Sequence, residues 1–318
     1  MGRAFWAWLP DRVDGRVRAA GWLSLIGQLL LVASGGAVRL TGSGLGCPTW
    51  PRCTDASLVT TPAMGIHGII EFSNRMLTFV LTIIVILTFL AVVRMFRTRK
   101  DLFWLAFWLG MSIPVQAVVG GFSVLFHLNP YMVGLHFVLS MVLVVVTTVL
   151  IQRIHTDPGL RVLAVPRWFE ATAWAAGIFA AITVLVGILT TGSGPHAGDI
   201  DTRRTGFDPA FMEHIHALPA YITGGLTLLL IGAAIGVEVG VVRRWLLWLT
   251  VTEIIQIGVG LLQSNTGLPG ILVGIHMVLA AGVLVFATAV ILELRRPVAS
   301  SVPGEDAPGG RRSQTVSS

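Results

Sequence analysis

The chain carries two histidines at matching positions of an internal repeat. Residues 116–140 align without a gap with residues 256–280 at a constant offset of 256 − 116 = 140, and His136 and His276 coincide. Both lie in long apolar segments, where an ionisable side chain is costly unless something binds it. The repeat therefore predicts paired binding sites.

Three further histidines, His67, His214 and His216, stand near the beginnings of apolar segments. Two neutral imidazoles that face each other across a helix bundle form the axial pair of a haem iron. Zinc or copper would also accept imidazole, but two ligands without a nearby carboxylate or thiolate make a poor metal site. His216 is preferred to His214 because it lies deeper in its segment. The remaining histidines fall in connections and are expected to contact only water: His127, His155 and His196.

The segment HGIIEFSNR contains an unusual polar cluster. At 100° per residue, His67, Glu71 and Asn74 share one helix face, and Arg75 adjoins it. One interpretation is a self-neutralising Glu71–Arg75 pair at i, i+4 spacing. The other is functional, because a carboxylate beside a haem could move protons or stabilise developing positive charge. Glu253 has no such neighbours and is interpreted as structural or interfacial.

The two cysteines of the chain lie close together in the sequence GLGCPTWPRC. Cys47 and Cys53 fall in a connection predicted to lie outside the cell, where thiols can oxidise. A disulfide is therefore predicted, and it could be a structural clamp or an accessible redox pair. A zinc site is disfavoured because structural zinc takes four ligands.

The composition requires a membrane protein. Hydrophobic residues make up 54% and charged residues 12% of the 318 residues, whereas soluble domains are about 25% charged. A span needs roughly 20 apolar residues, and backbone hydrogen bonding makes such spans helical. Eight are predicted, at 19–39, 68–93, 102–126, 131–152, 169–190, 214–237, 245–263 and 270–292.

Arginine and lysine residues predict the orientation of these spans. One set of connections is rich in them, with Arg94, Arg97, Arg99 and Lys100 in the first connection of that set. The opposite set contains few, so both termini are expected to be cytoplasmic in a multi-pass plasma-membrane protein. The net charge of +6 arises from these flanks, which argues against a nucleic-acid partner.

A second match extends the repeat to a whole half of the chain. Thr-Gly-Ser-Gly occurs at 41–44 and again at 191–194, each time before a long outside loop. The predicted fold class is thus an all-α integral membrane protein, with eight transmembrane helices in two pseudo-symmetric four-helix bundles. Because each half has an even number of spans, the halves run in the same sense. The predicted divisions are 1–18 (cytoplasmic), 19–152 (first half), 153–168 (cytoplasmic linker), 169–293 (second half) and 294–318 (disordered cytoplasmic tail).

Taken together, the GSGLGCPTWPRC loop, the IIEFSNR segment, the QAVVGG helix and the GLHF and GIHM histidines resemble the haem A synthase family over roughly residues 20–293. The resemblance implies a bacterial membrane enzyme that oxidises the C8 methyl of haem O to a formyl group, giving haem A, through successive hydroxylations. It places substrate haem O in the first half and a resident haem b in the second. Expected partners are haem O synthase, the assembly of cytochrome oxidase and an unidentified electron donor or acceptor.

The resemblance also implies roles for particular residues. Glu71 matches the catalytic glutamate, and His136 matches a haem ligand of the first half. His216 and His276 match the haem b ligands, and Cys47 with Cys53 matches the outer-loop cysteine pair.

One position departs from the family pattern, which has Glu-x-x-His where this chain has Glu71-Phe72-Ser73-Asn74. Either His67 replaces the missing ligand, about 10 Å away along the helix axis, or the substrate haem has one strong ligand. We favour His67.

Two other functions use the same features. A di-haem b electron carrier needs the histidines but no carboxylate at the first site, so Glu71 argues against it. A transporter with parallel repeats would place its polar residues near the midplane, whereas these histidines gather near one face.

Overall fold

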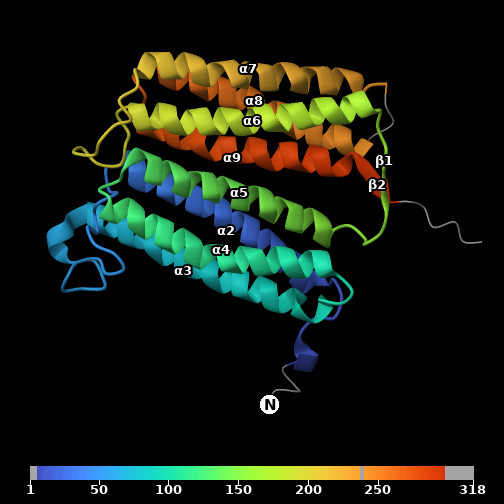
Figure 1. The fold of residues 1–318 in the computed structure, drawn as a ribbon, viewed down its shortest axis with the longest axis horizontal. Helices are drawn as coiled ribbons and strands as arrows, with labels where there is room; N and C mark the ends of the chain where they lie inside the picture. Colours follow the sequence, from blue (N-terminus) through green and yellow to red (C-terminus); the bar gives the residue numbers. More distant parts are fainter. Residues whose placement is uncertain (1–5, 237–239, 298–318) are drawn as a thin grey trace, which may run out of the picture.

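The structure is a computed structural model that describes residues 6–236 and 240–297, which are almost entirely helical (Figure 1). The long helices are α2 (Gly15–Leu40), α3 (Gly65–Val92), α4 (Lys100–Leu125), α5 (Pro130–Ile154), α6 (Arg167–Ser193), α7 (Pro209–Ala233), α8 (Gly240–Asn265) and α9 (Gly270–Glu293). The short elements are η1 (Pro62–Met64), η2 (Val93–Met95), β1 (Arg161–Leu163) and β2 (Arg295–Pro297).

Within the described residues, eight helices are long and apolar enough to span a membrane, which confirms the predicted fold class. The helices extend beyond the predicted spans at several ends because capping residues, not apolar residues, define where they begin. Asp14 accepts hydrogen bonds from the backbone N–H groups of Arg16 and Val17 and so caps α2. Asp208 caps α7 in the same way, and Pro209 follows as its first residue, a position where a missing N–H costs nothing. Helix α7 therefore begins five residues before the predicted span, whose last residue, 237, lies outside the described part.

The helices form two groups of four, α2–α5 and α6–α9, which lie side by side (Figure 1). In each group the first helix packs on the second and the fourth, and the third packs on the second and the fourth. The groups meet through α2 with α9, α5 with α6, and α5 with α9. Exchanging α2 with α6 and α5 with α9 leaves this set of contacts unchanged, as a twofold relation between parallel repeats requires.

The backbone repeats as well as the packing. His127 and Leu128 both have positive φ between α4 and α5, and Gly267 and Leu268 have positive φ between α8 and α9. The backbone N–H of Leu128 donates to Ser123 O, and that of Leu268 donates to Gln263 O. Each of these positions before α5 has its counterpart 140 residues later, before α9. The two tight turns are therefore copies of each other.

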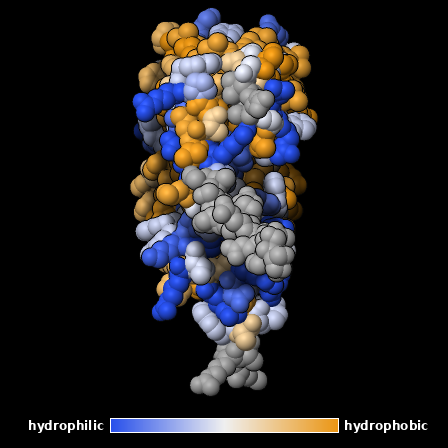
Figure 2. Space-filling view, turned by 90° about the vertical axis from the view of Figure 1, so that its right-hand side faces the viewer, coloured by the Kyte–Doolittle hydropathy of each residue, from blue (hydrophilic) through white to orange (hydrophobic). Residues whose placement is uncertain are grey.

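The two ends of the bundles differ. Loops 41–61 and 194–208 lie together at one end, here called the loop end. Strands β1 and β2 pair antiparallel at the other end, the arginine-rich end. Figure 2 looks onto the arginine-rich end, where hydrophilic side chains gather between hydrophobic flanks. The first four residues of the predicted tail, 294–297, include β2, and residues 298–318 lie outside the described residues.

Candidate functional site

The second bundle brings two predicted histidines together. His216 on α7 and His276 on α9 have ring centres 6.1 Å apart, with ring planes at 71°. With metal–nitrogen bonds of about 2.0 Å, two imidazoles on opposite sides of one metal ion have ring centres about 6 Å apart. The spacing of this pair thus fits two axial ligands of a single iron.

The hydrogen bonds of His216 and His276 leave a ring nitrogen of each available to bind a ligand. Nδ1 of His216 lies 3.0 Å from the carbonyl oxygen of Thr183 on α6. Because a carbonyl can only accept, Nδ1 carries the proton and Nε2 retains its lone pair. Nδ1 of His276 is buried without a hydrogen-bond partner, and a buried polar atom of this kind calls for a ligand or other explanation.

A glycine on the neighbouring helix makes room for each ring. A Cβ atom at Gly187 would lie 2.8 Å from Cε1 of His216, and one at Gly260 would lie 3.2 Å from Cε1 of His276. Only glycine permits these approaches without moving the imidazole. His214, by contrast, is exposed, and its Nδ1 lies 2.7 Å from the carbonyl oxygen of Ala210 in its own helix. The structure thus turns His216, not His214, toward His276.

In the first bundle, His136 repeats the environment of His276. A Cβ atom at Gly120 would lie 3.2 Å from its Cε1, and its Nδ1 is buried without a partner. Gln116 donates to Ser140, which in turn donates to the carbonyl oxygen of His136. Gln256 donates directly to the carbonyl oxygen of His276. The ring and the backbone carbonyl of His136 therefore have the same kinds of contact as those of His276.

His67 does not face His136. Its ring is exposed at the loop end, where Nδ1 lies 2.9 Å from Oγ of Ser43. It lines a cavity of about 540 Å³ between the two long loops, together with Leu45, Pro48 and Asp199. Among the described residues no ring contact joins His67 to another histidine, so its predicted role as a ligand stays a prediction.

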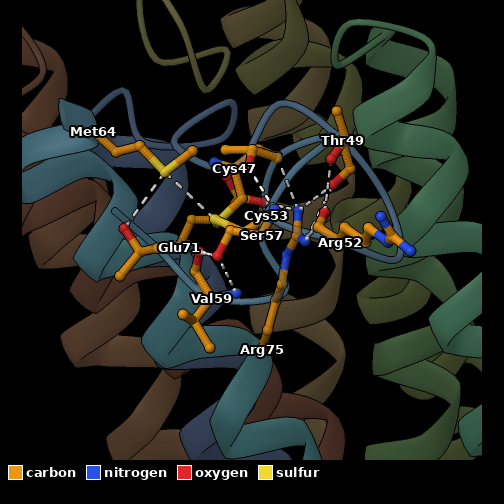
Figure 3. Close-up of a disulfide and its surroundings, with 11 residues drawn as sticks. Cys47, Thr49, Arg52, Cys53, Ser57, Val59, Met64, Glu71 and Arg75 are labelled. Carbon is orange, nitrogen blue, oxygen red and sulfur yellow. Dashed lines mark hydrogen bonds and ion pairs between the residues drawn. A yellow bond between two sulfur atoms is a disulfide. The ribbon is translucent and has the colours of Figure 1, made fainter. Parts of the chain in front are cut away.

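Glu71 and Arg75 hold the cysteine loop against α3 (Figure 3). The Glu71 carboxylate is buried, with 5% of the residue exposed. It accepts a 2.5 Å hydrogen bond from the backbone N–H of Cys47 and pairs with Arg75 at 2.5 Å. Arg75 also donates to the carbonyl oxygens of Cys47, Thr49 and Arg52. The predicted i, i+4 pair is present, and it anchors the loop.

The predicted disulfide between Cys47 and Cys53 is present, and both residues are fully buried. The loop approaches α3 so closely that a Cβ atom at Gly46 would lie 2.2 Å from the carbonyl oxygen of His67. A structural clamp fits this buried position better than an accessible redox pair, because exposed disulfides are the labile ones.

Glu253 is also buried, and Oγ1 of Thr227 donates to it at 3.0 Å. It lines a cavity of about 50 Å³ with Gln256, Thr183 and Thr223. The cavity is therefore lined by Thr183 and Gln256, the hydrogen-bond partners of His216 and His276.

The expectation that His155 and His196 contact only water was wrong. Nδ1 of His155 lies 2.9 Å from the carbonyl oxygen of Ile151, and its ring centre lies 6.2 Å from that of Trp22. Nε2 of His196 lies 2.7 Å from the carbonyl oxygen of Leu268, and the carbonyl oxygen of His196 accepts a hydrogen bond from Arg39. His196 joins the loop 194–208 to both bundles because the two halves meet at this end. No sequence pattern predicts this contact, because Arg39, His196 and Leu268 are far apart in the chain.

These features define a multi-pass helical membrane protein whose two halves each present a histidine from the fourth helix. The chain belongs to the COX15-CtaA family, described as cytochrome oxidase assembly protein, whose family model matches residues 18–290.

Several curated relatives are named heme A synthase. The protein of Exiguobacterium sibiricum is 29% identical over 131 residues, which cover 40% of this chain and 43% of the relative. That of Listeria monocytogenes is 28% identical over 171 residues (52% and 56%), and that of Staphylococcus epidermidis is 29% identical over 175 residues (53% and 57%). The chain spans about half the length of the curated relatives it matches.

Proposed function

We propose that the chain is a haem A synthase that oxidises the C8 methyl of haem O to a formyl group, with a resident haem b in the second bundle. Family membership and the names of the relatives support haem A synthesis. The observation that carries the proposal is the facing pair His216 and His276, with ring centres 6.1 Å apart.

In the second bundle, His216 and His276 would hold haem b through its iron. Haem b supplies one-electron chemistry when bound, and the protein supplies orientation and electrostatics. Thr183 fixes the ring of His216 through Nδ1, which is the outer-shell contact that orients such ligands. Gln256 fixes the backbone of α9 at His276.

In the first bundle, His136 would bind the iron of haem O as substrate. Two hydroxylations convert the methyl to a geminal diol, and loss of water then leaves the formyl group. Each hydroxylation is a two-electron oxidation of the carbon that replaces C–H by C–OH. An oxidant from outside the chain takes these two electrons, and the added oxygen atom comes with that oxidant or from water. Both Glu71 oxygens are engaged, so the carboxylate is held in one position, and we assign it the catalytic role at the methyl of haem O.

The proposal includes a location and partners. The protein would lie in the bacterial plasma membrane with both termini in the cytoplasm and the disulfide loop outside, as the arginine distribution favours. Haem O synthase would supply the substrate, and cytochrome oxidase assembly would consume haem A.

The test uses cells that make haem O but lack a haem A synthase of their own. Expression of this chain should produce haem A in extracted pigment separated by chromatography. The matched variant Glu71→Gln should still bind haem yet accumulate haem O or a hydroxylated intermediate. Absence of any haem A or hydroxylated intermediate with the native chain, despite bound haem b, would instead favour a di-haem electron carrier.

A further inference from the structure

The two bundles are alike on the side of α4–α5 and α8–α9. His136 lies against Gly120 as His276 lies against Gly260, with the same 3.2 Å approach to a Cβ atom. Nδ1 of both histidines is buried without a partner. One half of each site is therefore built in the same way.

The other side of each site is formed by α2–α3 and α6–α7, and here the halves differ. Glu71 and Asn74 on α3 repeat the spacing of Glu213 and His216 on α7 at an offset of 216 − 74 = 142. Asn74 therefore stands where the second bundle has its second imidazole.

Contacts support this correspondence. Oδ1 of Asn74 accepts a 2.7 Å hydrogen bond from Ser34 on α2, and His216 is bound to Thr183 on α6. The Thr-Gly-Ser-Gly match relates α2 to α6 by 191 − 41 = 150, which places Ser34 opposite residue 184, next to Thr183. Asn74 and His216 thus contact corresponding regions of α2 and α6, one residue apart in the alignment.

The neighbouring small residue has changed together with the histidine. Gly187 admits His216, since a Cβ atom there would lie 2.8 Å from its ring. The residue at the same offset of 150 is Ala37. By this alignment Ala37 carries a Cβ atom where Gly187 has none, so an imidazole at position 74 in the pose of His216 would meet that atom.

Asn74 does not replace the missing ligand. Its oxygen accepts a hydrogen bond from Ser34, and neutral carbonyl oxygens suit magnesium, calcium and manganese, whereas imidazole suits iron. Its amide nitrogen is a donor only and offers no lone pair to a metal. His67 lies two turns nearer the N-terminal end of α3, where it is exposed and contacts Ser43. At 1.5 Å per residue it lies about 10 Å from Asn74 along the axis.

We propose that the first bundle is a one-imidazole site, in which His136 alone ligates the iron and Asn74 lies on the opposite face; this replaces the expectation that His67 is the second ligand. The inference rests on the proposed function, because it requires a haem in each bundle. It assigns the two bundles different tasks: the second holds an iron closed by two strong ligands, and the first holds an iron with one face free for a small exogenous ligand.

The test is carbon monoxide binding to the reduced, purified full-length protein, together with the spin state of the oxidised protein. We expect one high-spin and one low-spin haem, with carbon monoxide saturating at about half of the total haem. His67→Ala should leave both readouts unchanged.

Two substitutions, tested together and singly, introduce the features of the second bundle into the first. Asn74→His combined with Ala37→Gly should convert the high-spin signal to low-spin and reduce carbon monoxide binding severalfold. Asn74→His alone should do so less completely, and Ala37→Gly alone should have no effect.

Two low-spin haems and no carbon monoxide binding in the native chain would overturn the inference while leaving the proposed function intact. Appearance of carbon monoxide binding only after His67→Ala would show that His67 is the second ligand. A protein that purifies without haem would contradict the proposed function as well.

Discussion

Replacing Gly187 by alanine tests the geometry of the second bundle most sharply. The new Cβ atom would lie 2.8 Å from Cε1 of His216, whereas carbon atoms prefer separations of about 3.5–4.0 Å. The ring must therefore move by about 0.7 Å, more than the roughly 0.5 Å that a preorganised site tolerates. If the ring leaves its rotamer instead, the cost is about 0.5–1.5 kcal/mol, which weakens haem binding by up to about tenfold.

The same reasoning gives a graded series with an internal control. Gly260→Ala requires a movement of only about 0.3 Å to relieve its 3.2 Å approach to His276, so its effect should be smaller. Gly258→Ala, on the same helix, has nothing within 4 Å of its Cβ position and should have no effect.

The assay is the low-spin optical and paramagnetic resonance spectrum of the purified protein, with haem content per chain. Gly187→Ala should shift the low-spin signal and lower the haem content, Gly260→Ala should do so weakly, and Gly258→Ala should match the native chain. An unchanged spectrum and haem content in Gly187→Ala, or equal losses in all three variants, would refute the reasoning.

Three further predictions follow from the loop end and the histidine pair. His216→Ala should abolish the low-spin signal of the second bundle while the protein still inserts, because insertion depends on apolar length and flanking arginines; a normal bis-imidazole signal would contradict the assignment. Cys47 and Cys53 should resist alkylation until the protein is reduced, as followed by mass spectrometry, and two freely labelled thiols would disprove the bond in the isolated protein. Arg75→Lys cannot reproduce the contacts of a planar guanidinium with three carbonyl oxygens, so limited proteolysis should cut loop 41–61 faster than in Lys100→Arg, and equal rates would show that Arg75 does not anchor the loop.

Apolar length and internal repetition made much of the fold predictable. A membrane span must be a helix of a certain length, so eight apolar stretches predicted eight helices, and an ungapped match predicted that α4–α5 and α8–α9 are copies. Helix ends were less predictable because they depend on polar caps such as Asp14 and Asp208.

The candidate site was predictable where it rests on regular helices and not where it rests on loops. The match at an offset of 140 aligned His136 with His276, and the same approach at 150 would have aligned Ala37 with Gly187. The hydrogen bond from the backbone N–H of Cys47 to the carboxylate of Glu71 joins residues 24 apart, and Cys47 lies in an irregular loop. Helix periodicity contains no information on such a contact, and the same loop positions Ser43, which binds His67.

The most direct measurement of the central claim is the pigment extracted from the purified full-length protein, resolved by chromatography and mass spectrometry. The account predicts haem b together with haem O or its oxidised products, because the two bundles hold a resident cofactor and a substrate. Haem b as the only pigment, in cells that make haem O, would contradict it.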